Sequence, residues 1–329
     1  MNNKQISEIS AKTNLSQATV SKVLNHCYGV SGDVRERVFK ECGHIKGVDS
    51  VKNHISIYVI LPETPNFFWG NKLPSLDNIK IKYNIYSRLG DNDTVIRYLT
   101  QATELDSEVI IVAASLNKET EEILTQLSKK KFIIFLTEYN QAFNTFYVGS
   151  NPKTDGGQLA LSCLKHHNLN EKVLLIRDIL PSDCHSKTSA MRLEGFLEKL
   201  PNKNFDIIDI EMQTGIPYFS STLARELSAL LKKNQYHSVV CFNGFTDVLC
   251  SALQKIKLPF KVNCYGFENS PQNKKFAELG FLKAVVCQNF SNQLSCALEL
   301  SKSYLESGCY PESKYTHIQS KTIDFSIEN

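Results

Sequence analysis

The sequence predicts two distinct parts, a small N-terminal domain of three helices and a larger α/β domain of two lobes. Residues 1–47 show helical periodicity without a strand pattern, whereas from Ile55 onward short β-rich runs alternate with helical segments. That alternation is typical of parallel sheets covered by helices on both faces. The chain of 329 residues is also too long for one ordinary core. Its roughly ten predicted strands fit two sheets better than one.

The N-terminal part begins with two helices that a short turn connects. Ile9 lies on the inner face of the first helix, and Asn14 is a residue type that adopts the left-handed conformation of a tight turn. Ser16 is a suitable N-cap for the second helix, in which Val20 and Val23 face inward at helical spacing.

A third helix completes this domain. It begins after the N-cap Ser31 and runs over Asp33–Cys42, and its Val34, Val38 and Phe39 close a miniature core. Residues 1–47 are therefore predicted to form a helix-turn-helix domain.

Four residues near the start of the second helix remain on its outer face. They are Gln17, Ala18, Ser21 and Lys22. At these positions a recognition helix reaches base edges in the major groove of DNA. Gln pairs with adenine, Lys reaches guanine acceptors, and an alanine methyl contacts a thymine methyl. The hydroxyls of Ser16 and Thr19 are better placed for phosphates.

The net charge of +3 is confined to the same part of the chain. Residues 1–54 contain eight Lys and Arg against five acidic residues, whereas the basic and acidic residues of the remainder cancel. A basic excess there suits a partner that carries phosphates, so we expect double-stranded DNA.

The amino-acid sequence of this segment resembles the N-terminus of lactose-repressor (LacI) type regulators. The resemblance covers Ser16-Gln17-Ala18-Thr19-Val20-Ser21-Lys22-Val23-Leu24-Asn25, followed by Val30-Ser31 and Arg35-Glu36-Arg37-Val38. It implies that Ser16, Gln17, Ala18, Thr19, Ser21, Lys22 and Asn25 bind DNA. It also implies a homodimer that places two recognition helices on a pseudo-palindromic operator.

The linker departs from that family. Residues 48–54 are a short polar linker, and the stretch Gly43–Val51 carries two glycines where the family has a hinge helix with an apolar wedge. Glycine weakens a short helix by about 1 kcal/mol. Val48 or Val51 is the candidate wedge, and an atypical hinge is expected.

Residues 55–329 are predicted to form the two-lobed effector-binding and dimerisation domain. Its expected strands are Ile55–Leu61, Lys82–Arg88, Glu108–Ala113, Lys131–Thr137, Phe146–Val148, Lys172–Ile176, Phe205–Ile210, Ser238–Phe242, Asn263–Phe267 and Lys283–Cys287. Its expected helices are Asp93–Glu104, Lys118–Lys130, Lys153–His166, Thr188–Leu200, Tyr218–Lys233, Asp247–Lys255, Pro271–Leu279 and Ser291–Ser307.

Polar and aromatic residues follow several of these strands, where ligands bind in α/β folds. The segments resemble those of the sugar sensor used by LacI-type regulators, which has a periplasmic-sugar-binding-protein fold. Asn66, Phe67, Phe68 and Trp69 follow the first strand and would contact the sugar ring, although core packing is an alternative for the aromatics.

The same resemblance implies five further ligand-binding residues. They are Glu138, Arg192, Asn243, Glu268 and Gln288. Glu268 stands where the family has a shorter acid, which narrows the expected pocket by about one methylene. The implied ligand is a sugar bound between the lobes.

Pro74 and Gly70 lie where the family has a long helix that contributes to dimerisation. Because proline disrupts a helix interior, the dimer surface is expected to be remodelled. No heptad tail follows Phe325, which favours a dimer over a tetramer.

Composition and motifs argue against several classes of protein. The chain has ten cysteines without a CxxC pair, and its start is polar, so we expect reduced thiols, a cytoplasmic location and no metal. GxSxG, HExxH, P-loop and GxGxxG motifs are absent, which argues against an enzyme and gives no reason to expect a cofactor. A regulator that responds to a sugar phosphate or a nucleobase remains an alternative, as does a sugar-binding module that does not bind DNA.

Overall fold

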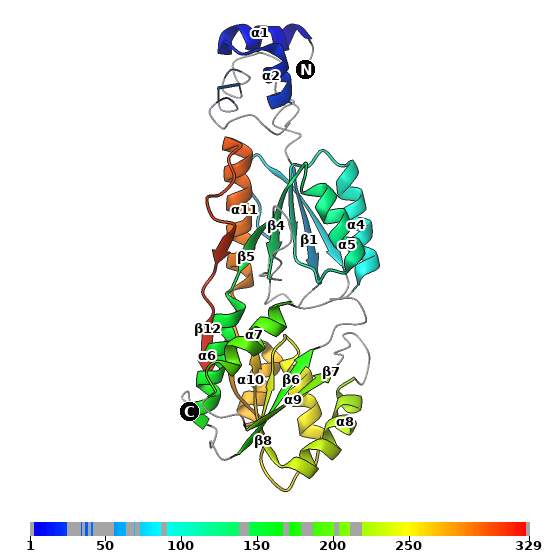
Figure 1. The fold of residues 1–329 in the computed structure, drawn as a ribbon, viewed down its shortest axis with the longest axis vertical. Coiled ribbons are helices and arrows are strands. Elements are labelled where there is room, and N and C mark those ends of the chain that lie inside the picture. The colour runs from blue at the N-terminus through cyan, green and yellow to red at the C-terminus, as the bar shows by residue number, and fades with distance from the viewer. Residues whose placement is uncertain are drawn as a thin grey trace. The chain divides into compact units, whose positions relative to one another are not determined.

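A computed structural model describes residues 3–24, 34, 37–38, 41, 56–63, 69, 73–86, 91–137, 145–166, 171–178, 187–200, 204–210 and 219–326. The chain divides into two compact units (Figure 1). The first comprises Met1–Ser87, Asp91–Val148 and Ser291–Thr316, and the second comprises Arg88–Gly90, Gly149–Phe290 and His317–Asn329. The predicted linker and hinge, residues 43–54, lie outside the described residues.

The N-terminal helices α1 (Asn3–Thr13) and α2 (Gln17–Leu24) are joined by a three-residue turn. Asn14 has a φ of 53°, as the turn requires, and the Ser16 hydroxyl accepts a hydrogen bond from the Thr19 amide at 3.0 Å. The predicted left-handed residue and the predicted N-cap are therefore confirmed. Val20 and Val23 pack in a small core that Ile9 and Val38 complete. Most of the predicted third helix, its N-cap Ser31 and Phe39 lie outside the described residues.

The first unit contains a six-stranded sheet in the order β11-β5-β4-β3-β1-β2. β1 pairs in parallel with both β2 and β3, and the pairs β3 with β4 and β4 with β5 are also parallel, as predicted. In chain order the elements are β1 (Ser56–Pro62), β2 (Lys80–Tyr86), α4 (Asn92–Glu104), β3 (Val109–Val112), α5 (Lys118–Leu127), β4 (Phe132–Leu136), β5 (Phe146–Gly149), α11 (Phe290–Ser307) and β11 (Tyr315–His317).

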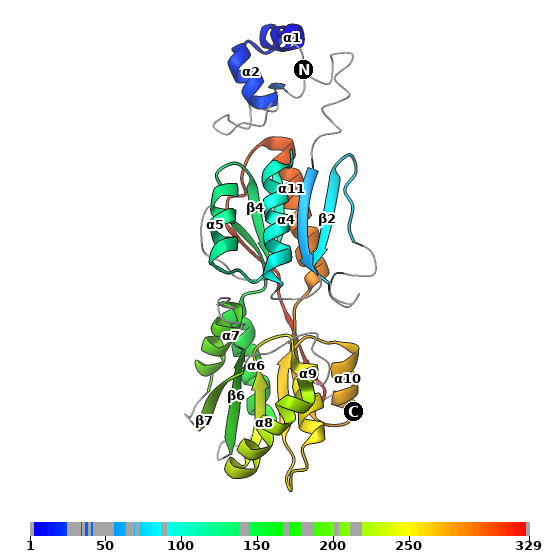
Figure 2. The same ribbon diagram turned by 90° about the vertical axis from the view of Figure 1, so that its right-hand side faces the viewer.

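Helices cover both faces of this sheet, with α4 and α5 on one side and α11 on the other (Figures 1 and 2). This explains why β3 and β4 are buried along their whole length, because strands inside a parallel sheet meet a helix on each face. Residues 73–79, which contain Pro74, form no helix, in agreement with the prediction that this proline prevents one.

The second unit repeats the arrangement with the sheet order β12-β10-β9-β8-β6-β7. Its elements are α6 (Pro152–His166), β6 (Lys172–Asp178), α7 (Lys187–Leu197), β7 (Phe205–Ile210), α8 (Phe219–Asn234), β8 (Tyr236–Cys241), α9 (Thr246–Lys255), β9 (Asn263–Phe267), α10 (Pro271–Glu278), β10 (Leu282–Cys287) and β12 (Lys321–Asp324).

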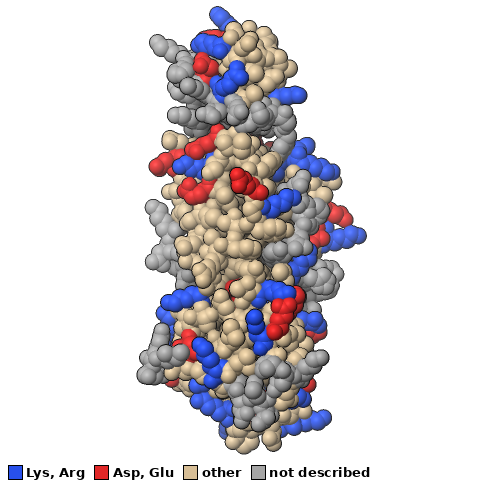
Figure 3. Space-filling model, turned by 60° about the vertical axis from the view of Figure 1, so that its left-hand side comes forward, with Lys and Arg blue, Asp and Glu red and all other residues tan. Residues whose placement is uncertain are grey.

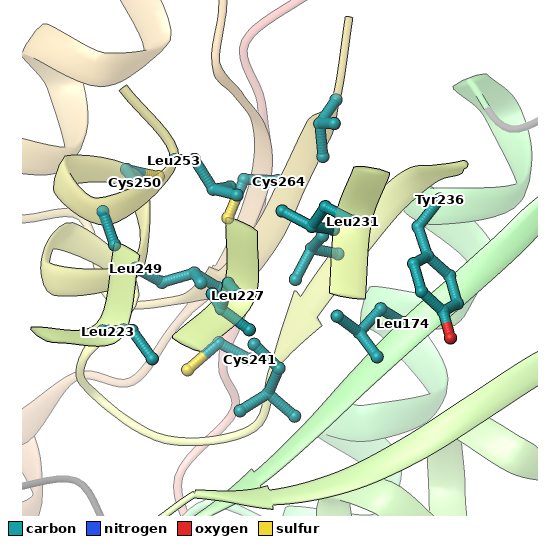
Figure 4. Close-up of a cluster of buried hydrophobic side chains, with 14 of the residues drawn as sticks. Leu174, Leu223, Leu227, Leu231, Tyr236, Cys241, Leu249, Cys250, Leu253 and Cys264 are labelled. Atoms are coloured by element: carbon teal, nitrogen blue, oxygen red, sulfur yellow. The ribbon is translucent and has the colours of Figure 1, made fainter. Parts of the chain in front are cut away.

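Two apolar cores fill the second unit, one on each face of its sheet. One core lies between the sheet and α8 and α9, and includes Leu227, Leu249 and the thiols of Cys241 and Cys264 (Figure 4). The other lies beneath α6 and α7 and includes Phe196 and the strand-end aromatics of β8 and β9. The predicted α/β architecture with helices on both faces is therefore confirmed.

Two strands of the structure are not among the predicted ones. β12 pairs antiparallel with β10, and β11 joins the edge of the first sheet. Both strands are short and polar, and lie at sheet edges where one side only is paired. Such strands carry no apolar alternation, so the sequence pattern does not indicate them.

Candidate functional site

Polar residues converge at one edge of the second sheet. Asn243 follows β8, Glu268 follows β9 and Gln288 follows β10, and these three strands are neighbours. Because the strands are parallel, their carboxyl ends lie at the same edge, where α/β proteins bind ligands. Arg192 from α7 and Asp155 from α6 complete the cluster. We refer to Asp155, Arg192, Asn243 and Glu268 as the polar cluster; their exposed fractions are 2, 4, 9 and 5%.

Arg192 is the central residue of the polar cluster. Its guanidinium carbon lies 3.8 Å from the centroid of the Phe267 ring, and Nη1 donates to the Phe242 carbonyl at 3.1 Å. Nε and Nη2 are buried and have no hydrogen-bond partner among the described residues. Two donors of a fixed planar fork are therefore available for an acceptor that is not part of the described chain.

Close packing of α6 on α7 sets the position of Arg192. A Cβ at Gly156 would lie 1.8 Å from the backbone oxygen of Arg192, and a Cβ at Gly195 would lie 1.8 Å from that of Lys153. Only glycine leaves room at these two contacts, so the helices approach until their backbones touch. This contact brings Arg192 beside Asp155, which immediately precedes Gly156.

Glu268 is held by its backbone and by its neighbours. It has a φ of 70°, and the side-chain amide of Asn273 donates a hydrogen bond to its backbone carbonyl oxygen at 2.7 Å. Its Oε1 accepts from the Gln288 side-chain amide at 3.1 Å, and its Oε2 accepts from the Gln288 backbone at 3.3 Å. Burial raises the pKa of Glu268 to about 7, against the opposing effects of Arg192 and Gln288.

Gln288 is predicted from the sequence to bind the ligand. In the structure its side-chain nitrogen donates to Glu268, and its Oε1 accepts from the Ser150 hydroxyl at 3.1 Å. These contacts make it a positioning residue for the Glu268 carboxylate.

Asn243 is oriented by its own turn. Its Oδ1 accepts hydrogen bonds from the Cys241 thiol at 2.8 Å and from the Phe245 amide at 3.0 Å. With the carbonyl oxygen so fixed, the amide nitrogen is the remaining group. That nitrogen is buried and has no partner in the part of the chain that the structure describes.

Asp155 was missed by the sequence reasoning. It lies in the first turn of α6, and burial raises the pKa of its carboxyl, with Arg192 as the main opposing influence. Its Oδ2 has no hydrogen-bond partner within the described ranges. An acid in the first helical turn ordinarily interacts with the helix dipole, so the local sequence gave no sign of its burial. The two glycines that follow it were the available signal.

The remaining predicted ligand residues belong to the first unit. Trp69 is buried, and its indole nitrogen donates to the Pro62 carbonyl at the end of β1, at 3.3 Å. Asn66, Phe67, Phe68 and Glu138 lie outside the described residues.

The predicted DNA-binding positions lie mainly on the surface of the N-terminal helices. Gln17, Ala18 and Lys22 are exposed, as is the N-cap Ser16, whereas Thr19 and Ser21 are half-buried and Asn25 is not described. The Gln17 amide donates weakly to the Ser7 hydroxyl at 3.3 Å. Figure 3 shows Lys and Arg side chains on this part of the surface.

Within the described ranges, no three His, Cys, Asp or Glu side chains are grouped to hold a metal ion. Among the described helices, none has the length and apolar character needed to cross a membrane. The seven described cysteines are free thiols, four of them buried.

Two α/β units, each with a mainly parallel sheet covered by helices on both faces, define a two-lobed α/β architecture. The chain belongs to the family described as periplasmic binding protein domain, whose model matches residues 75–308. Residues 1–74 precede that match.

Solved structures share this fold at low sequence identity. A glucose-galactose binding protein of Geobacillus stearothermophilus aligns with a TM-score of 0.66 and 15% identity over 83% of this chain and 98% of its own. A Bacteroides fragilis protein assigned to LacI transcriptional regulators aligns with a TM-score of 0.66 and 13% identity over 83% and 97%. A myo-inositol binding protein of Caulobacter aligns with a TM-score of 0.66 and 17% identity over 82% and 93%. No curated protein matches the chain.

Proposed function

We propose that this chain binds a sugar through the polar cluster of its second unit. The observation that carries the proposal is the buried Arg192 guanidinium, whose Nε and Nη2 have no partner in the described chain. A buried charged donor is costly unless it is hydrogen-bonded, so a ligand oxygen is the natural partner. Asp155 Oδ2 supplies an acceptor and the Asn243 amide supplies a further donor.

This mixture of groups suits a polyhydroxylated ligand. A sugar hydroxyl donates one hydrogen bond and accepts others, so it satisfies a carboxylate and a guanidinium at the same time. The named ligands of the structural neighbours, glucose-galactose and myo-inositol, are of this chemical class. A sugar phosphate is disfavoured, because two carboxylates of the polar cluster would repel its charge.

Calorimetric titration with a panel of monosaccharides and cyclitols tests the sugar site. Replacement of Arg192 by Gln removes the charged donors and should lower the affinity for the ligand that binds best by about tenfold or more. Arg177→Gln is the matched control, because Arg177 is exposed on β6 and pairs with Asp209. Equal affinity of Arg192→Gln and the wild-type protein would refute the assignment.

A second candidate function is sequence-specific DNA binding by the N-terminal helices, which would make the chain a sugar-responsive transcription regulator, and most simply a repressor. The supporting observation is the geometry of α1 and α2: a three-residue turn, a left-handed Asn14, a Ser16 cap and an exposed Lys22. A helix-turn-helix domain has these features and presents the start of its second helix to the major groove. Such a protein would act in the cytoplasm as a homodimer, with its two second helices roughly 34–36 Å apart.

Selection of bound fragments from sheared source DNA tests this second function. The wild-type protein should retain a few sites with a shared pseudo-palindrome. Lys22→Ala should lose that preference, whereas Lys12→Ala should keep it, because Lys12 lies on α1 and pairs with Glu8. Sugar binding without any preferred DNA sequence would instead identify a sugar-binding module that does not read DNA. If the chain bound nucleobases and no sugar, the proposed regulatory function would stand, and the proposal that the ligand is a sugar would be refuted.

A further inference from the structure

When both of its carboxyls are ionised, the polar cluster contains one more negative charge than positive charge among its described residues. Asp155 and Glu268 are both at least 95% shielded from solvent, and Arg192 is the one guanidinium beside them. Arg192 favours ionisation of both carboxyls, while the Asp155 charge opposes that of Glu268. The three groups therefore form one electrostatic unit.

The other described groups around this unit do not supply the missing positive charge. Glu268 contacts the neutral amide of Gln288, and its carbonyl accepts from neutral Asn273. Asp155 lies near the hydroxyls of Ser150 and Ser320, and more weakly near His317, which is exposed. Lys274 and Lys321 are exposed and act on the nearby Cys287 thiol, and neither is among the groups that shift the pKa of Asp155 or Glu268.

An uncompensated carboxylate away from water is costly, so a molecule that enters the polar cluster is favoured if it brings a positive charge. The geometry specifies where that charge would lie. Asp155 Oδ2 is buried without a partner, and each Glu268 oxygen accepts one hydrogen bond from Gln288 and retains a lone pair. An ammonium group has three donors and no acceptor, which matches these oxygens.

The donors of the polar cluster constrain the rest of the ligand. Arg192 Nε and Nη2 and the Asn243 amide nitrogen are unpartnered donors in the described chain and require oxygen acceptors. We propose that the ligand is an amino sugar or an aminated cyclitol, with its ammonium group held by Asp155 and Glu268 and its hydroxyl oxygens held by Arg192 and Asn243. This inference rests on the proposed sugar-binding function and specifies an ammonium group as the partner of Asp155.

Matched pairs of ligands test the inference by calorimetry near neutral pH. The pairs are glucosamine with glucose, galactosamine with galactose, and mannosamine with mannose, together with the N-acetyl derivatives, in which the amine cannot carry charge. At least one amine should bind ten times or more tightly than its hydroxyl partner, and its N-acetyl derivative should bind no better than that partner. Asp155→Asn should reduce the preference to threefold or less, because the amide of Asn carries no charge to pair with the ammonium group.

Two controls make the outcome decisive. Asp206→Asn removes a half-buried carboxylate that pairs with Lys172 on the neighbouring strand, and it should leave the amine preference unchanged. If Asp155→Asn fails to fold, the wild-type comparison of amine with hydroxyl decides alone. Neutral sugars that bind as tightly as their amines would overturn the amine assignment and leave the sugar-binding function intact. Failure of every member of the panel to bind the folded protein would count against the sugar-binding function itself.

Discussion

The two units have the same strand order but differ at the strand ends. In each sheet, the strand third from the β11 or β12 edge is followed by a residue with positive φ: Thr137 after β4 (64°) and Glu268 after β9 (70°). The first two strands of the second sheet are joined through α7, which carries Arg192, whereas the described residues between β1 and β2 form no helix. The backbone bend is thus common to both sheets, and the chemistry depends on which side chain occupies it.

The largest expected effect is a pH dependence of stability that arises from Glu268. Its pKa is raised to about 7 from 4.5, so the folded state binds more protons than the unfolded state between these values. The stability present below pH 4.5 is lost as the pH rises through 7, and amounts to about 3 kcal/mol. Urea unfolding at pH 5 and pH 8 should show this loss in the wild-type protein and a smaller loss in Glu268→Gln.

Glu278→Gln provides the control for this prediction, because Glu278 is exposed at the end of α10. It should retain the wild-type pH dependence. If Glu268→Gln also retains the wild-type pH dependence, the Glu268 carboxyl is not the group that titrates. The comparison of Glu268 with Thr137, the positive-φ residue of the first unit, would then have no electrostatic basis.

A smaller effect is expected from disrupting the backbone contact of α6 with α7. In the first unit, the described residues between β1 and β2 form no helix that could make a corresponding contact. Gly156→Ala places a Cβ 1.8 Å from the Arg192 carbonyl oxygen and must separate the helices. The clash outweighs the roughly 1 kcal/mol that alanine gains in helix propensity, and we expect a net loss of about 1–3 kcal/mol in unfolding free energy. Ligand affinity should fall with it as Arg192 moves.

Gly157→Ala sharpens this comparison. The nearest atom to a Cβ at Gly157 is 3.5 Å away, which is an ordinary contact. This variant should therefore be as stable as the wild-type protein or more so. Equal destabilisation of both variants would indicate a general intolerance of α6 rather than a specific contact.

The smallest effect is expected at Cys241, which holds the Asn243 carbonyl oxygen. Cys241→Ala removes one hydrogen bond worth about 1 kcal/mol, so ligand affinity should fall by roughly three- to tenfold. Cys250→Ala removes a buried thiol from the same apolar core without touching Asn243. Titration of both variants separates orientation of the amide from loss of core packing, because only the first should weaken binding.

The sequence was sufficient for most of the α/β architecture. β7 and β9 begin and end at the predicted residues, because apolar runs between turn residues define them. It also placed Arg192, Asn243 and Glu268 among the functional candidates, and the structure brings these three together. Asp155 could not be found in the same way, because its surroundings are set by tertiary contacts with residues distant in the sequence, such as Arg192 and Ser320. β11 and β12 were missed because pairing at a sheet edge, rather than local pattern, determines them.

The placement of β11 and β12 also bears on how the chain matures during synthesis. Residues 315–324 contribute one edge strand to each sheet, although the other strands of both sheets lie N-terminal to residue 288. Both units therefore receive their last strand when the same short segment leaves the ribosome, and neither completes its sheet before the other. Until then β5 and β10 each have an edge without a partner strand, so both sheets are open to mispairing over the same interval.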